Sequence, residues 1–280
     1  MSILTCPICA EKLDISGKCY RCAGGHSFDM ARSGYVNLLL SKHIGKTVHG
    51  DNKLMVQARR KFLDSGYYTP LAVSLCDTVE KYFHGGVLLD AGCGEGYYTS
   101  KVAERLGNCE RSADIYGIDV SKIAVDHAAK RNRSVKYAAA SVFHIPVESG
   151  SCHMLITLFA PYCGDEFTRV LAEKGIMIMA IPSRDHLWEL KQAIYDVPYK
   201  NEVRSYELEG FDFLEKESIR YTMHIASQEE LQALFSMTPY YYRTGKKQQE
   251  RLVKLTELDI TADFELLIYQ KIERSGFDGT

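Results

Sequence analysis

The chain has 280 residues, of which 46% are hydrophobic and 25% are charged, the proportions of a globular protein that can bury a full core. Its formal net charge of −2 excludes a surface that is basic throughout, so any contact with nucleic acid must come from a local patch. No apolar run approaches the roughly 20 residues that span a bilayer, and no signal-peptide pattern opens the chain. We therefore expect a cytoplasmic protein without a membrane segment.

The N-terminal segment holds a cluster of metal-ligand residues. Four of them follow the pattern C-x2-C-x12-C-x3-H: Cys6, Cys9, Cys22 and His26. This pattern places two ligand pairs at the separation that small zinc modules use. Cys19 leaves an alternative open, because it forms a second C-x2-C with Cys22 and would complete an all-cysteine site. Either set fills a zinc tetrahedron, so we predict a structural zinc ion rather than a catalytic one.

The chain divides into a short module, a linker and a larger domain. Residues 1–40 carry the cysteine cluster and are too few to bury a core without a metal ion. Residues 41–51 are polar, contain two glycines and are typical of a linker. Between residues 42 and 61 the only acidic residue is Asp51. The same stretch contains six basic residues: Lys42, Lys46, Lys53, Arg59, Arg60 and Lys61. They indicate either a phosphate-binding patch or a solvated helix face.

The larger domain, residues 52–280, alternates between apolar strands and helical segments. Helical spacing is found at 54–63, 71–82, 96–106, 122–131, 165–172, 185–195, 228–235 and 248–255. Strand-like segments are found at 86–91, 115–118, 135–139, 153–160, 175–181, 219–225 and 264–272. This alternation predicts a Rossmann-like α/β fold, with a mostly parallel sheet that helices cover on both faces.

A glycine-rich turn follows the strand at 86–91. It reads D-x-G-x-G-x-G and consists of Asp90, Gly92, Gly94, Glu95 and Gly96 with the residues between them. The dinucleotide fingerprint G-x-G-x-x-G fails, because Tyr97 stands where its third glycine belongs. An acid at the strand end would lie badly against a pyrophosphate but can organise hydrogen bonds around the amino-acid end of S-adenosylmethionine. The turn therefore favours that cofactor over NAD and indicates a class I methyltransferase fold.

Two further positions fit the same cofactor. Asp119 ends the next strand, 23 residues beyond Gly96, where an acid can hold the two ribose hydroxyls. A helix N-cap is the alternative role for Asp119. Ser141 follows a later strand, where such enzymes commonly contact the adenine ring, although any loop can place a polar residue there.

These motifs resemble one family over nearly the whole chain, the RlmA-type 23S ribosomal RNA guanine-N1 methyltransferases. The matching segments are 6–9, 26–31, 34–39, 57–60, 62–64 with Gly66 and Tyr68, 90–99, 160–161, 186–191 and 237–239. The resemblance implies zinc on Cys6, Cys9, Cys22 and His26. It also implies cofactor contacts from Tyr68, His186 and the turn around Gly94 to Gly96, and it suggests a homodimer. Spacing alone would not single out Tyr68 or His186.

A guanine-N1 methyltransferase must take its base from a loop or flip it out, and the N1 proton needs an acceptor. The acceptor candidates are Asp185, His186 and Glu189. Pro161 and Tyr162 are candidates for shaping the base pocket. The zinc module would act as an RNA-gripping arm, with Tyr35 stacking and phosphate contacts from Arg32, Lys42, Lys46, Arg59 and Arg60.

Two other function classes fit parts of the sequence. A small-molecule methyltransferase would use the same glycine-rich turn and suits the near-neutral charge, but it rarely needs a zinc module. A zinc-dependent RNA-binding protein without catalysis would keep the module and leave RNA unmethylated.

Overall fold

The computed structural model describes residues 2–40, 51–109, 111–202 and 205–273. The linker predicted at 41–51 lies outside the described residues except for Asp51, and so do Lys42 and Lys46 of the predicted phosphate-binding patch. Within the described part of the chain, no helix is long and apolar enough to cross a membrane.

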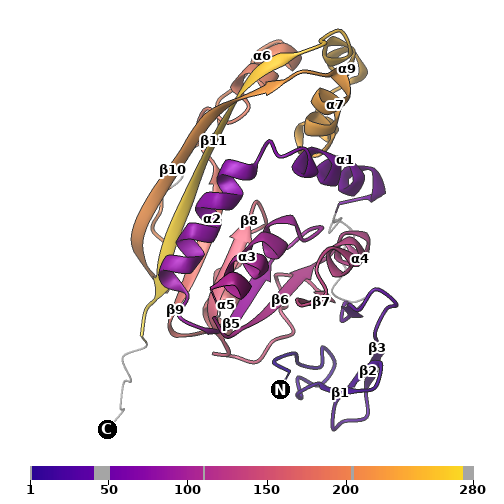
Figure 1. Ribbon diagram of the computed structural model, residues 1–280, viewed down its shortest axis with the longest axis vertical. Coiled ribbons are helices and arrows are strands. Elements are labelled where there is room, and N and C mark those ends of the chain that lie inside the picture. Colours follow the sequence, from indigo (N-terminus) through magenta and orange to yellow (C-terminus); the bar gives the residue numbers. More distant parts are fainter. Residues whose placement is uncertain (1, 41–50, 110, 203–204, 274–280) are drawn as a thin grey trace.

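An eight-stranded sheet forms the centre of the molecule (Figure 1). Its strand order is β10-β11-β9-β8-β5-β6-β7-β4. The strands are β4 (Val36–Asn37), β5 (Gly86–Ala91), β6 (Ala113–Asp119), β7 (Lys136–Ala139), β8 (Cys152–Leu158), β9 (Leu171–Pro182), β10 (Phe211–Ile225) and β11 (Leu258–Lys271). All neighbours from β4 to β9 pair in parallel, and β11 pairs antiparallel with both β9 and β10. The predicted mostly parallel sheet is therefore confirmed.

Helices pack on both faces of this sheet. They are α1 (Lys53–Asp64), α2 (Thr69–Tyr82), α3 (Tyr97–Asn108), α4 (Lys122–Arg131), α5 (Gly164–Val170), α6 (Trp188–Ile194), α7 (Gln228–Ser236), α8 (Tyr240–Arg243) and α9 (Lys246–Val253). Successive residues of β5 point to opposite faces, so Leu88 belongs to one buried cluster and Leu89 to the other. The first cluster includes residues of α2, α3 and α4, and the second includes residues of α5 and of the N-terminal segment.

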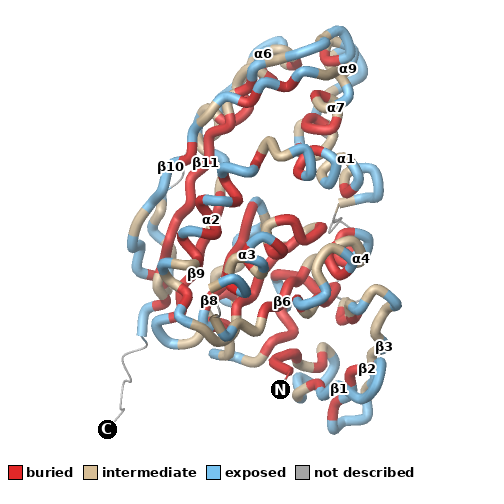
Figure 2. The backbone as a smooth tube through the Cα atoms, viewed as in Figure 1, coloured by how far each residue is buried: buried red, intermediate tan, exposed pale blue. Residues whose placement is uncertain are grey.

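Strands β10 and β11 run past the rest of the sheet and carry a separate group of helices (Figure 1). There α1 packs against α7, and α6 packs against α9. The first half of β10 was not predicted as a strand. Most of its residues are exposed, as Figure 2 shows, and half of them are charged, so the alternation of apolar and polar residues that marks a half-buried strand is weak.

The N-terminal module is a three-stranded antiparallel sheet of β1 (Asp14–Ser16), β2 (Cys19–Arg21) and β3 (Ser27–Asp29). It is held against the larger domain at two places. The backbone of Ile3 to Thr5 forms hydrogen bonds with residues 146 to 148, and β4 extends the large sheet by pairing with β7. The predicted module boundary at residue 40 therefore falls after a strand that already belongs to the larger domain's sheet.

Candidate functional site

The predicted zinc ligands meet in one cluster within the N-terminal module. The ligand atoms of Cys6, Cys9, Cys22 and His26 all lie within 4.8 Å of one another. His26 Nδ1 is 3.5 Å from Cys6 Sγ and 3.3 Å from Cys22 Sγ, and the sulfurs of Cys9 and Cys22 are 3.6 Å apart. Zinc at roughly 2.3 Å from sulfur and 2.0 Å from nitrogen separates tetrahedral ligand atoms by about 3.5–3.8 Å. The cluster therefore fits a zinc ion.

Cys19, the alternative ligand, belongs to different surroundings. Its sulfur lies 3.2 Å from Ser27 Oγ and 3.1 Å from Arg21 Nε. Cys19 is the first residue of β2, whereas Cys22 follows the last residue of that strand. The structure thus supports His26 rather than Cys19 as the fourth ligand.

We predict that Cys22→Ser abolishes stoichiometric zinc binding, whereas Cys19→Ser keeps one zinc ion per chain. Loss of the ion should lower the melting temperature by roughly 10 °C, because structural zinc contributes several kcal/mol and each kcal/mol shifts a domain of this size by about 2–4 °C. Elemental analysis and calorimetry measure both effects. Equal zinc loss in the two variants would contradict the assignment.

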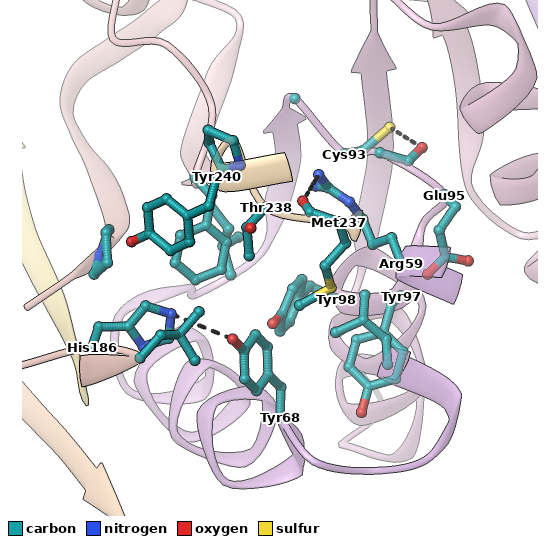
Figure 3. Close-up of a pocket in the computed structure, with 18 of the residues that line it drawn as sticks. Arg59, Tyr68, Cys93, Glu95, Tyr97, Tyr98, His186, Met237, Thr238 and Tyr240 are labelled. Atoms are coloured by element: carbon teal, nitrogen blue, oxygen red, sulfur yellow. Dashed lines mark hydrogen bonds between the residues drawn. The ribbon is translucent and has the colours of Figure 1, made fainter. Parts of the chain in front are cut away.

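A cavity of about 340 Å³ lies where the helices carried by β10 and β11 meet the carboxyl ends of the parallel strands. Its walls come from α1, the turn after β5, the ends of β8 and β9, the loop before α6 and residues 237–243. Figure 3 shows Arg59, Cys93 and Glu95 on one side and His186 on the other, with Tyr240 above. Ligands of open α/β sheets bind at this edge of the sheet.

Most of the residues predicted to hold the cofactor line this cavity. They are Tyr68, Asp90, Gly92, Gly94, Glu95 and His186. Gly96 begins α3 with a φ of 81° and packs against α4, where an added Cβ would lie 2.8 Å from Ala128 Cβ. Gly92 has a φ of 93°, and a Cβ there would lie 2.4 Å from Ala160 Cβ. The turn therefore depends on glycine both for its backbone conformation and for its close packing.

Asp90 is buried, and its two carboxylate oxygens differ in their surroundings. Oδ2 accepts a hydrogen bond of 2.5 Å from Thr99 Oγ1, whereas Oδ1 is buried without a partner among the described residues. Burial raises the pKa of Asp90 to about 7, the Thr99 hydroxyl opposes the rise, and the Asp119 charge adds to it. An unpaired buried oxygen in a cavity wall is a position for a ligand donor.

Asp119 and Ser141 do not line the cavity. The carboxylate oxygens of Asp119 accept hydrogen bonds from the backbone N–H groups of Gly94 at 3.0 Å and Ser121 at 2.8 Å. Asp119 therefore fixes the turn that carries Gly94. Ser141 Oγ accepts a hydrogen bond from the Phe143 backbone N–H at 3.2 Å, as in a local loop turn.

His186 contacts Tyr68 in the cavity wall and is buried. The Asp263 backbone N–H donates to His186 Nδ1 at 3.3 Å, so the proton of the neutral ring lies on Nε2, 3.4 Å from Tyr68 Oη. Burial, aided by the Lys191 charge, lowers the pKa of His186 to about 3. The ring is therefore neutral and acts as a hydrogen-bond donor, which leaves the hydroxyl hydrogen of Tyr68 to donate to a bound group.

The structure does not bring the other two proton-acceptor candidates into the cavity. Asp185 forms ion pairs with Lys200 at 2.8 Å and Arg220 at 3.0 Å, which lower its pKa. Glu189 accepts hydrogen bonds from the backbone N–H and the hydroxyl of Thr261, both at 2.8 Å. Both carboxylates thus connect the α6 region to the long strands.

The basic residues of α1 have different roles in the structure. Arg59 lines the cavity, pairs with Asp51 at 2.9 Å and donates to the Met237 carbonyl at 3.3 Å, while its Nε is buried without a partner among the described residues. Arg60 is outside the cavity and pairs with Asp64 at 3.5 Å. Charge reversal at Arg59 would therefore disturb the cavity as well as any RNA contact.

Sequence reasoning missed several cavity residues. Phe159 lines the cavity, whereas the predicted base-pocket residues Pro161 and Tyr162 do not. The segment from Met237 to Tyr240 and Arg243 forms a wall about 140 residues away in sequence from the glycine-rich turn. The triplet at 237–239 belonged to the family resemblance, but neither spacing nor composition gave it a role.

Two family models match the chain. One is described as "RlmA, N-terminal" and matches residues 4–43, and the other is described as "Methyltransferase domain" and matches residues 83–236. The first covers the zinc cluster and β4. The second starts before β5 and ends with α7, so it covers the glycine-rich turn and most of the parallel sheet.

Relatives with named activities are similar over much or all of the chain. A 23S rRNA (guanine(748)-N(1))-methyltransferase of Streptomyces fradiae is 36% identical over 195 residues, which cover 68% of this chain and 67% of the relative. YxjB of Bacillus subtilis (strain 168), whose name provisionally assigns 23S rRNA guanine-N1 methylation, is 30% identical over 96% of this chain and 98% of its own. The solved YcgJ protein of Bacillus subtilis shares the fold, with a TM-score of 0.50, 12% identity and coverage of 72% of this chain and 99% of its own.

Proposed function

Since the chain belongs to the RlmA-type family of 23S ribosomal RNA guanine-N1 methyltransferases, we propose that it methylates N1 of a guanine in a hairpin of 23S ribosomal RNA with S-adenosylmethionine. One observation carries the proposal. The same chain holds a Cys3His cluster that fits zinc and a glycine-rich turn that opens into a cavity at the carboxyl ends of parallel strands. A ribosomal RNA substrate also favours a cytoplasmic location. The homodimer implied by the resemblance stays a prediction.

The cofactor's amino-acid end fits the turn side of the cavity. Arg59 Nε is a buried donor and Asp90 Oδ1 a buried acceptor, and both lack a partner among the described residues. The Arg59 donor suits the carboxylate of S-adenosylmethionine, and the Asp90 acceptor suits its ammonium group. Gly92 and Gly94 let the backbone approach this end of the cofactor. Asp119, outside the cavity lining, would keep the turn in place through the hydrogen bond it accepts from the Gly94 backbone N–H. The bound cofactor supplies an electrophilic methyl group on its sulfonium.

This chain's own residues contribute positioning and exclusion of water. Tyr68 and neutral His186 would orient the cofactor with hydrogen-bond donors, without removing a proton. Met237, Thr238 and Tyr240 also line the cavity, where the Met237 side chain and the Tyr240 ring contribute apolar surface. In-line displacement depends mainly on such positioning.

We predict that cofactor affinity depends on pH through Asp90. The free protein holds a proton on this carboxyl up to a pKa of about 7, whereas the cofactor's ammonium group needs the carboxylate. The affinity should rise about tenfold per pH unit below pH 7 and level off above it. Titration calorimetry from pH 5.5 to 8.5 measures the slope. Asp90→Asn should be weak and flat with pH, while Asp114→Asn, outside the cavity lining, should keep the wild-type slope.

The proposed function is tested by mass-spectrometric mapping of unmodified large-subunit ribosomal RNA after incubation with the zinc-loaded protein and S-adenosylmethionine. We expect one N1-methylguanine in a hairpin, and none when the cofactor is omitted. If the cofactor binds but the RNA mass stays unchanged, the proposal fails. A small-molecule methyltransferase or an RNA-binding protein without catalysis then becomes the better hypothesis.

A further inference from the structure

We propose that Phe159 and Arg243 form the subsite for the target guanine. The Phe159 ring stacks on the base, and the Arg243 guanidinium donates to O6 and N7 on its Hoogsteen edge. This inference rests on the proposed function, because it names how the same cavity recognises its substrate. Both residues line the cavity, and they reach it from opposite parts of the chain, the end of β8 and the end of α8.

Phe159 combines an unusual backbone conformation with an exposed ring. Its φ of 58° lies in the left-handed region, which non-glycine residues rarely adopt. Its side chain is 41% exposed, as much as that of Phe213. Strained residues that persist in a rigid framework are concentrated at functional sites. The Phe159 backbone N–H donates to the Ala180 carbonyl on β9 at 3.2 Å, which helps to hold this conformation.

The strained residue also lies beside the cofactor turn. Ala160 packs so closely on Gly92 that an added Cβ on the glycine would lie 2.4 Å from Ala160 Cβ. The ring of Phe159 is therefore presented to the cavity next to the turn that would hold the cofactor. Aromatic side chains in RNA-binding proteins stack on bases that have left their helix.

Arg243 lines the cavity and its side chain is exposed. Among the described residues no carboxylate forms an ion pair with it. An arginine can donate two parallel hydrogen bonds to guanine O6 and N7, which distinguishes guanine from the other bases. A guanidinium on this edge leaves guanine N1 accessible, because N1 lies on the neighbouring Watson–Crick edge.

Buried contacts fix the short helix that carries Arg243. The Lys191 ammonium group is fully buried, lies 5.2 Å from the Tyr240 ring centroid and donates to Asn201 Oδ1 at 2.6 Å. Asn201 in turn donates to the Ser183 carbonyl at 2.7 Å, three residues before His186. Tyr240 is one helical turn before Arg243 in α8, so this network fixes the backbone from which Arg243 extends.

The subsite also accounts for the charge on the base when N1 loses its proton. Among the described residues that line the cavity, the carboxylates are Asp90 and Glu95, both on the turn, and Arg131 already pairs with Glu95. The N1 proton therefore passes to water, and the negative charge left on the base is delocalised onto O6, where the Arg243 guanidinium stabilises it. The N1 electron pair then forms the bond to the methyl carbon, and the electron pair of the broken carbon–sulfur bond stays on sulfur.

The test compares a 23S hairpin RNA carrying guanosine with one carrying 7-deazaguanosine at the methylated position, which lacks the N7 acceptor. We expect the wild type to lose about tenfold in kcat/KM on the 7-deaza RNA, as for one charge-assisted hydrogen bond. Arg243→Ala should lose about 10–100-fold on the guanosine RNA and show no further loss on the 7-deaza RNA. Arg133→Ala removes an exposed arginine outside the cavity lining and should keep the tenfold discrimination.

A pH profile separates recognition from a purely structural role. If Arg243 stabilises the deprotonated base, the defect of Arg243→Ala should shrink as pH rises from 7 to 9, because hydroxide then removes N1 protons more readily. Phe159→Leu should raise KM for the RNA and leave cofactor affinity unchanged, and Phe159→Tyr should restore the KM. An Arg243→Ala variant that keeps the tenfold discrimination overturns the assignment while methylation itself stands. If the wild type methylates no RNA, the proposed function fails and the subsite fails with it.

Discussion

Gly92→Ala is expected to reduce cofactor affinity by at least about 100-fold. The left-handed φ of 93° alone costs an alanine about 1–2 kcal/mol. The added Cβ would also lie 2.4 Å from Ala160 Cβ, so either the turn or the end of β8 must move. Movement of the turn displaces Gly94, and movement of the end of β8 displaces Phe159, and both residues line the cavity. Each tenfold loss of affinity corresponds to about 1.4 kcal/mol. Titration calorimetry with S-adenosylmethionine measures the loss.

Two variants separate the clash from the backbone strain. Ala160→Gly in the Gly92→Ala background removes the facing methyl group and should restore part of the affinity, because residues in contact are coupled. Gly150 also has a positive φ, 66°, but an added Cβ there would meet open space, and the residue does not line the cavity. Gly150→Ala should therefore leave the cofactor affinity unchanged. If the double variant binds no better than Gly92→Ala, close packing against Ala160 is not the cause.

The fold could be predicted well wherever burial imposes a period on the sequence. The helix predicted at 122–131 matches α4, whose buried residues recur at helical spacing, and the strand predicted at 86–91 matches β5, whose last four residues form a continuous buried run. The strand predicted at 219–225 is shorter than β10, which begins eight residues earlier. That half of β10 is held by antiparallel pairing with β11 while its side chains face solvent, so its residues need not alternate.

From spacing alone, the site could be predicted only where its residues lie in one continuous motif, and Tyr68 and His186 were found only through the family resemblance. The zinc cluster and the glycine-rich turn are local, and their spacing is a direct consequence of metal geometry and of a tight turn. In the sequence, Asp185 and Glu189 were as plausible proton acceptors as His186. In the structure, their carboxylates are instead bound by Lys200 and by residues of β10 and β11. Such long-range partners, like Tyr240 and Arg243 in the cavity wall, become visible only once the chain is folded.

Arg131→Met is expected to destabilise the protein by about 3 kcal/mol near pH 8. Arg131 Nε and the terminal nitrogen Nη2 donate to Glu95 Oε2 at 3.0 and 2.5 Å, and the Glu95 side chain is only 2% exposed. Removing one partner of a buried pair leaves an uncompensated charge, which costs about 3–5 kcal/mol. Arg131 is itself 22% exposed, so the lower end of that range applies. Urea denaturation measures the free energy of unfolding.

The pH dependence identifies Glu95 as the cause. Burial raises the pKa of Glu95 and the Arg131 charge opposes the rise, so the pKa climbs further in Arg131→Met. A carboxyl with a raised folded-state pKa stabilises the fold below its unfolded pKa and loses that contribution as pH rises through the folded value. The defect should therefore shrink between pH 8 and pH 5, and Glu95→Gln should relieve it at pH 8.

Lys130→Met is the matched control on the neighbouring position of α4. Lys130 pairs with Asp126 at 2.5 Å, but the Lys130 side chain is 59% exposed and that of Asp126 is 35% exposed, so loss of the pair should change stability by less than about 0.5 kcal/mol. A defect in Arg131→Met that does not change with pH would mean that the arginine stabilises α4 through its pair with Asp64 instead. The expected contrast follows from burial, since the two ion pairs have similar lengths and differ mainly in the water around the carboxylate.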